Sequence, residues 1–314
     1  MLATITQILR NWTLPIAMVA GAIGYPFFIH LTPLLPWLIF AMLTITFCRV
    51  SATDIRISTL HWVLLAVQVL GAIGVFYALK DIDVWIAEGA MICFIAPTAT
   101  AAAVITEKLG GSAASLTAFT MVSNIGCAVT APALFPLIHP AGHDISYWMA
   151  VLTILQKVFP LLIFPFFVAM AIKCFTPTLH RRMMALPNLA FYLWAVTITI
   201  LMGQVIATII NEQQENLLSQ IWIALAALTV CGLQFWIGKV IGARWNQRIT
   251  GGQALGQKNT VFAIWLAHTY MTPITAVGAG SYVIWQNIIN ASQLWLKQRE
   301  RLKGDTAPAN EDPA

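Results

Sequence analysis

The chain has 314 residues, of which 59% are hydrophobic and only 9% are charged, and its mean hydropathy is +0.78. Soluble proteins carry about 25% charged residues, so this composition excludes a soluble globular domain and indicates an all-α polytopic membrane protein. The net charge of +5 does not indicate nucleic-acid binding, because the basic residues stand beside hydrophobic segments rather than on one face or tail. The partner that the composition implies is the lipid bilayer.

Hydrophobic segments between charged or turn residues predict about ten transmembrane helices. In chain order these spans are 12–30, 34–49, 59–79, 84–107, 112–138, 146–172, 187–210, 219–240, 250–269 and 272–296. Residues 304–314, "GDTAPANEDPA", are polar and contain prolines, which predicts a disordered C-terminal tail.

The basic residues predict the orientation of these spans. Fourteen of the 17 basic residues fall at the chain ends or in loops after even-numbered spans, whereas the other loops carry Lys80 with several acidic residues. By the positive-inside rule both termini are cytoplasmic. The two basic residues that remain, Lys157 and Lys258, lie inside spans. The fourteen are Arg10, Arg49, Arg56, Lys108, Lys173, Arg181, Arg182, Lys239, Arg244, Arg248, Lys297, Arg299, Arg301 and Lys303.

The sequence contains none of the catalytic motifs that would indicate an enzyme. No H-E-x-x-H or G-x-S-x-G motif and no pair of intramembrane aspartates is present, and the five cysteines are dispersed without C-x-x-C spacing. We therefore expect no catalytic site, no metal site, no disulfide and no cofactor.

Two spans are predicted to be broken. In the fourth span Pro97 removes a backbone donor, and in the ninth Gly256 precedes the polar quartet Gln257–Thr260. Ten spans divide into two sets of five, and both breaks fall in the fourth span of a set. Because five is odd, the second set is inverted, and paired broken helices in inverted repeats are typical of a transporter site near the membrane midplane.

A helix broken inside a membrane exposes N–H groups that lipid cannot satisfy, so these groups must line a cavity. The positive ends of the second half-helices, near Thr98–Thr100 and near Gln257–Asn259, would together attract an anion. We predict that substrate is bound by Thr98, Thr100, Asn259 and Thr260.

Several segments resemble the bile acid:sodium symporter family. "APTATAAAVIT" and "TAFTMVSNIGCAVTAPALFPLI" resemble its fourth and fifth spans, and "ALGQKNTVFAI" resembles its ninth. "MLTITFCRVSATDIR" and "LTILQKVFPLLIFPF" are similar to its second and sixth spans. The resemblance covers nearly the whole chain in order.

The resemblance implies two inverted repeats, residues 1–145 and 146–303, followed by the tail 304–314. It also implies a panel domain of spans one, two, six and seven, and a core domain of spans three to five and eight to ten, in which the broken spans four and nine cross. The implied function is sodium-coupled transport of organic anions such as bile salts, pantoate or keto acids. The implied location is a bacterial inner membrane.

Only part of the family's ligand pattern is retained. Thr100 and Asn259 match residues beside the substrate, while Gln68 and Thr120 match sodium ligands. Alanine stands at three other sodium-ligand positions, leucine at a fourth, and Lys258 replaces the glutamine of the Q-N-S motif next to Gln257. Because methyl groups offer no oxygen to a hard cation, both sodium sites are predicted to be degraded. The four replaced positions are Ala102, Ala103, Leu116 and Ala254.

Lys258 has three interpretations, which the sequence leaves open. It lies ten residues from Arg248 and ten from His268, so reaching the cytoplasmic interface is the first and least natural. In the second, its ammonium is a surrogate for the missing cation. In the third, it gains and loses a proton during transport.

The predicted function is alternating-access transport of a small organic anion without the usual sodium requirement. Lys258, Gln68, Thr120 and Gln257 form the predicted ion or coupling site. The alternatives are a conventional sodium symporter and a non-transporting receptor of the same fold. The sequence leaves the substrate and the oligomeric state open.

Overall fold

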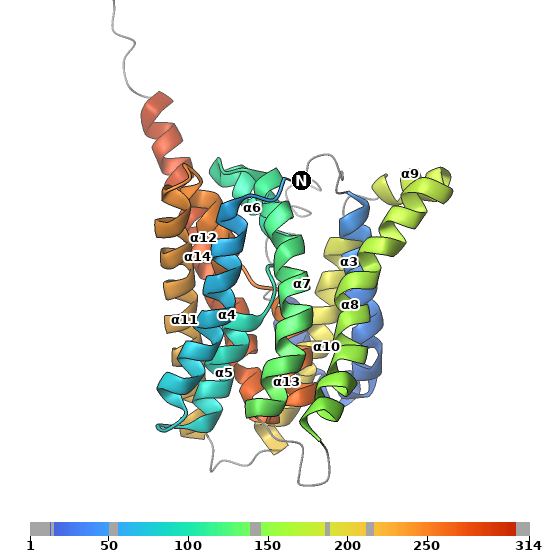
Figure 1. The fold of residues 1–314 in the computed structure, drawn as a ribbon, viewed down its shortest axis with the longest axis vertical. Helices are drawn as coiled ribbons and strands as arrows, with labels where there is room; N and C mark the ends of the chain where they lie inside the picture. Colours follow the sequence, from blue (N-terminus) through green and yellow to red (C-terminus); the bar gives the residue numbers. More distant parts are fainter. Residues whose placement is uncertain are drawn as a thin grey trace, which may run out of the picture.

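A computed structural model describes Thr13 and residues 16–49, 56–138, 146–185, 189–211 and 217–305. The protein is a bundle of α-helices (Figure 1). Within the described residues, β structure is limited to one isolated antiparallel bridge, between Thr98 and Lys258. The predicted tail, 304–314, lies almost entirely outside the described residues.

After a helical segment at 16–23, the described residues between 25 and 138 form seven elements. They are α2 (Tyr25–Phe28), the 3-10 helix η1 (Ile29–Leu34), α3 (Leu35–Cys48), α4 (Thr59–Leu79), α5 (Val84–Ile95), α6 (Ala102–Leu109) and α7 (Ala113–Ile138). The sequence separated the first two spans at 31–33. The structure instead continues through η1, a short 3-10 helix that contains Pro33 and tolerates the missing donor.

The described residues of the second half form eight elements. They are α8 (Tyr147–Phe175), α9 (Pro177–Met184), α10 (Leu189–Asn211), α11 (Leu217–Ala243), α12 (Arg248–Gly256), α13 (Thr260–Tyr270), the 3-10 helix η4 (Pro273–Thr275) and α14 (Ala276–Asp305). Most predicted boundaries agree with these within a few residues. Helix α14 extends nine residues beyond the predicted end of its span at 296.

Both predicted breaks are present. The fourth span is divided into α5 and α6 by the non-helical segment 96–101, and the ninth is divided into α12 and α13 by residues 257–259. At the first break Pro97 cannot donate to a helical hydrogen bond. At the second, Gly256 lies against the ring of Phe235, where an added Cβ would overlap the ring.

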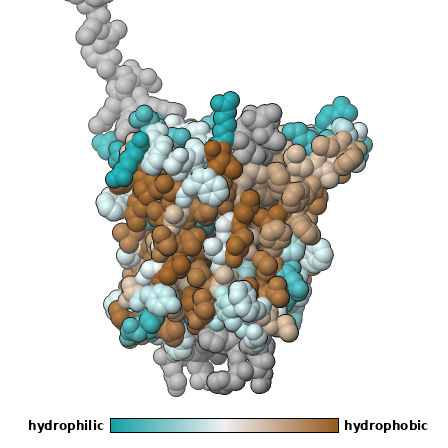
Figure 2. All heavy atoms as spheres, in the orientation of Figure 1, coloured by the Kyte–Doolittle hydropathy of each residue, from teal (hydrophilic) through white to brown (hydrophobic). Residues whose placement is uncertain are grey.

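Several helices are suited to a membrane. Five stretches among the described residues are long and apolar enough to cross one, and two shorter apolar helices, Val84–Ile95 and Tyr192–Ala207, accompany them. The surface shows a broad apolar belt with hydrophilic residues at both ends (Figure 2). The chain is thus an all-α protein with a membrane-compatible surface. The five stretches are Tyr25–Cys48, Thr59–Leu79, Ala113–Ile138, Tyr147–Phe175 and Leu217–Ala243.

The helices form two groups, and α7 and α13 lie between them (Figure 1). Helices α4, α5, α11, α12 and α14 pack on one side, and α3, α8 and α10 pack on the other. The ends of α9, α6 and α14 lie at one end of the bundle. The connection from α4 to α5, which carries Asp81 and Asp83, lies at the opposite end.

Candidate functional site: the crossing of two broken helices

The two breaks meet and pair with each other. Residues Thr98 and Lys258 form the antiparallel bridge. The amide of Ala99 donates to the carbonyl of Gln257 at 2.9 Å, and the amide of Asn259 donates to the carbonyl of Pro97 at 2.7 Å. Backbone groups that the breaks release from helices are thereby satisfied inside the protein, as a membrane interior requires.

Side chains from each break cap the half-helix of the other. Thr98 Oγ1 donates to the carbonyl of Ala254 at 2.7 Å, and Lys258 Nζ donates to the carbonyl of Phe94 at 2.9 Å. Ala254 is four residues before Lys258, and Phe94 is four residues before Thr98. The two contacts are therefore reciprocal, and each supplies a partner to a carbonyl in the last turn of a helix, where intrahelical donors run out.

Helices α7 and α14 flank the bridge on its two edges. The amide of Thr98 donates to Ser123 Oγ of α7 at 3.1 Å. The amide of Lys258 donates to Gln286 Oε1 of α14 at 2.9 Å. The crossing is thus held between α7 and α14.

Gln68 of α4 caps the end of α5. Its Nε2 donates to the carbonyls of Ile95 at 2.9 Å and Ala96 at 3.3 Å. Its Oε1 accepts a 2.8 Å hydrogen bond from the hydroxyl of Ser123. Gln68 and Ser123 are both fully buried, so this pair orients the end of α5 from inside the protein.

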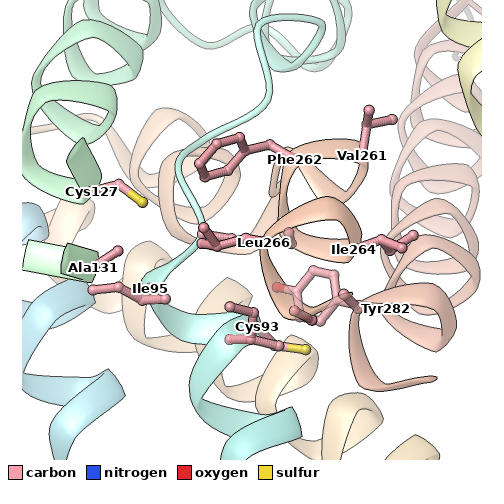
Figure 3. Packing of buried hydrophobic residues seen from close by; sticks show 14 of the residues in the cluster. Cys93, Ile95, Cys127, Ala131, Val261, Phe262, Ile264, Leu266 and Tyr282 are labelled. Atoms are coloured by element: carbon pink, nitrogen blue, oxygen red, sulfur yellow. The ribbon is translucent and has the colours of Figure 1, made fainter. Parts of the chain in front are cut away.

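A second buried pair joins α11 and α14 to the crossing. Tyr282 donates its hydroxyl to the carbonyl of Gly256 at 2.9 Å. Gln234 Nε2 donates to the carbonyl of Cys93 at 3.1 Å and to the Tyr282 hydroxyl at 3.0 Å. Figure 3 shows Tyr282 and Cys93 close together beside α13. The last turns of α5 and α12 are therefore both capped by side chains.

The electrostatics of this region favour a cation. The C-terminal ends of α5 and α12 converge on the bridge, and the C-terminus of a helix carries partial negative charge. The Lys258 side chain is 1% exposed, and its ammonium bonds the α5 terminus at Phe94. Lys258 therefore does not reach the cytoplasmic interface, and the first of its three interpretations is wrong.

The predicted site residues are only partly gathered at the bridge. Thr98, Gln68 and Lys258 form the contacts above. Gln257 contributes its carbonyl, and its buried Oε1 has no hydrogen-bond partner among the described residues. Asn259 Oδ1 accepts from the amide of Phe262 at 3.2 Å and so caps the start of α13.

The other three predicted residues are placed differently. Because the bridge is antiparallel, Thr100 and Thr260 leave it at opposite ends. Thr100 is partly exposed just before α6, and Thr260 is buried at the start of α13. Thr120 donates its hydroxyl to the carbonyl of Leu116 within α7 at 3.0 Å.

Several contributing residues were not predicted. Ser123, Gln234, Tyr282 and Gln286 are buried within otherwise apolar helices. Polar residues inside membrane helices are commonly functional or paired, which is the signal that could have indicated them. To predict the direction in which these side chains point, one must know how α7, α11 and α14 are rotated.

The residues that replace sodium ligands at the implied positions offer no side-chain oxygen to that ion. Ala102 and Ala254 are fully buried and present methyl groups, whereas sodium requires oxygen ligands. The Lys258 ammonium occupies the negative end of α5 nearby. In the part of the chain that the structure describes, no group of three or more His, Cys, Asp and Glu residues could hold a metal ion.

Comparison with family models and with curated proteins finds no match to this chain.

Proposed function

We propose that this chain is a secondary transporter that moves a small organic anion by alternating access and does not require sodium. The observation that carries the proposal is the buried crossing, in which the Lys258 ammonium bonds the C-terminal end of α5. Crossed half-helices place charged helix ends at membrane depth, where they bind ions and anionic substrates. The resemblance to bile acid:sodium symporters points to the same function.

The proposal also includes the arrangement of the spans. The ten spans form two inverted repeats, 1–145 and 146–303, with both termini in the cytoplasm of a bacterial cell. The reciprocal bonds from Thr98 to Ala254 and from Lys258 to Phe94 support a two-fold relation between the repeats. Helices α3, α8 and α10 belong to the panel, and the helices around the bridge form the core.

Lys258 acts as a fixed cation in this proposal. Its ammonium replaces the charge that sodium would supply between the helix ends, so no ion has to bind before the substrate. The bond to Phe94 holds Nζ at the C-terminal end of α5, where the partial negative charge of the helix end favours a positive group. Two helices begin beside the bridge, α13 at Asn259 and Thr260 and α6 after Thr100, at opposite ends of it. The substrate anion is drawn to the N-terminal end of α13.

The test is uptake of radiolabelled organic anions into proteoliposomes. Uptake by the wild type should be unchanged when sodium is replaced by potassium or choline, and exchange should persist when a proton gradient is collapsed. Strict sodium dependence would instead establish a conventional symporter. Binding without flux would establish a receptor, and loss of exchange with the proton gradient would make Lys258 a proton carrier.

The Lys258→Gln variant sharpens this test. It removes the charge and retains a hydrogen-bond donor for Phe94. We expect the variant to lose uptake in potassium and to regain part of it in sodium. A variant that transports as the wild type does in both salts would show that the ammonium has no part in coupling.

A further inference from the structure

Asn124 of α7 is a buried amide without a partner. Its side chain is 2% exposed, and neither its Nδ2 nor its Oδ1 has a hydrogen-bond partner in the described part of the chain. The large majority of buried side-chain polar atoms in proteins are paired with protein groups or ordered water, and an unpaired amide is costly. A group outside the chain is therefore the natural partner for Asn124.

The position of Asn124 relates it to the crossing. It follows Ser123, whose hydroxyl accepts the amide of Thr98 at the bridge. Residues three or four apart share a helix face, so Asn124 shares a face with Cys127 and Ala131.

The same face of α7 belongs to a buried cluster that α13 shares. In Figure 3, Cys127 and Ala131 lie across the connection between α5 and α6 from Phe262 and Leu266 of α13, and all four belong to that cluster.

The chemistry of this location selects a ligand class. The N-terminal end of a helix attracts a negative group, and α13 begins at membrane depth beside the bridge. A carboxamide donates through Nδ2 and accepts through Oδ1, so it suits a neutral polar group rather than a second charge. A hydroxyl satisfies either atom, and a carbonyl satisfies Nδ2.

We propose that Asn124 binds a hydroxyl or carbonyl group of the transported organic anion beside the crossing. This inference rests on the proposed transport function and adds a residue that determines specificity. It predicts two effects of opposite sign when the amide is removed. Without ligand, the variant is as stable as the wild type or more stable. Its affinity for the polar substrate is lower.

The first measurement is thermal unfolding in detergent without ligand. Asn124→Leu and the smaller Asn124→Ala are compared with Asn287→Leu, a control in which the lost amide donates to the carbonyl of Val283 at 2.6 Å. Asn124→Leu should melt at the same or a higher temperature than the wild type. Lower melting temperatures for both Asn124 variants would mean that the amide is paired within the protein or through a structural water, and would overturn the proposal.

The second measurement is binding and uptake of butyrate, 2-hydroxybutyrate and 3-hydroxybutyrate, which differ only in one hydroxyl. The wild type should bind at least one hydroxy acid about tenfold more tightly than butyrate, the effect of one well-made hydrogen bond. Asn124→Leu should lose that preference and keep its affinity for butyrate, while Asn287→Leu keeps both.

The outcomes separate this inference from the function on which it rests. A wild type that takes up none of the three acids contradicts transport of small carboxylates, and this inference with it. Uptake without discrimination contradicts only the role of Asn124, as does a preference that survives in Asn124→Leu.

Discussion

Individual side chains solve the main physical problem of this structure, which is two interrupted helices inside an apolar bundle. Each interruption leaves carbonyls in a last helical turn, and in a membrane interior such groups cannot turn to water. Thr98, Lys258, Gln68, Gln234 and Tyr282 donate to them. The polar residues are therefore part of the backbone structure of the crossing as well as candidates for function.

The Thr98 hydroxyl can be tested separately from the Thr98 backbone. Thr98→Val keeps the shape and removes the donor to Ala254, leaving a buried carbonyl unpaired at a cost of about 1–3 kcal/mol. We expect a lower melting temperature for Thr98→Val than for Thr98→Ser. The control is Thr153→Val, because the exposed Thr153 hydroxyl bonds only its own helix at Met149. Equal melting temperatures for the two Thr98 variants would contradict the capping role.

Gln68 and Ser123 should act as a unit. Each bonds the other, and each also bonds the crossing, Gln68 at Ile95 and Ser123 at Thr98. The effects of Gln68→Leu and Ser123→Ala on the free energy of unfolding should therefore be non-additive, with a coupling of about 0.5–3 kcal/mol. The measurement is a double-mutant cycle by thermal or denaturant unfolding in detergent. Additive effects would show that the two side chains stabilise the crossing independently.

Close packing of α11 against α12 positions the second broken helix. A Cβ added to Gly238 would overlap the carbonyl of Gly251, and one added to Gly242 would overlap the carbonyl of Gln247. Gly238 and Gly242 form a G-x-x-x-G pattern, which is typical of closely approaching membrane helices. The glycines therefore set how near α12, and with it Lys258, can come to the core.

This packing predicts a contrast between two glycines of the same helix. Gly238→Ala should destabilise the protein by about 1–3 kcal/mol, the usual cost of overpacking. Gly232→Ala should be neutral or stabilise by up to about 1 kcal/mol, because nothing lies within 4 Å of the added Cβ and alanine favours the helix. Folded yield by gel filtration and melting temperature measure both. Similar behaviour of the two variants would contradict the proposed close approach.

The sequence predicted these elements better than their contacts. Proline and glycine chemistry indicated the breaks at Pro97 and Gly256, and apolar length indicated most helices. The polarity of the breaks did not reveal that they pair antiparallel, so Thr100 and Thr260 were expected in one pocket although they leave the bridge at opposite ends. Helix rotation, which directs Ser123 and Gln286 to the bridge, depends on tertiary packing that a single sequence does not encode locally.

The whole molecule has one chemically useful asymmetry. Cys174 is exposed, whereas the other four cysteines are buried. Cys174 lies in the last turn of α8, next to Lys173 and directly before α9. This end of the bundle carries most of the basic residues, so the positive-inside rule predicts that it faces the cytoplasm. A native cysteine can thus report the orientation.

A membrane-impermeant maleimide should label Cys174 in inside-out vesicles and leave it unlabelled in intact spheroplasts. Cys174→Ser removes the signal and serves as the background for Asp81→Cys, a position exposed at the opposite end of the bundle. That variant should show the reverse pattern, since the loop carrying Asp81 faces outward in the same topology. Labelling of Cys174 from outside, or of both positions from one side, would contradict the orientation. It would also invert the direction in which the crossing presents Lys258 and the start of α13 to the two compartments.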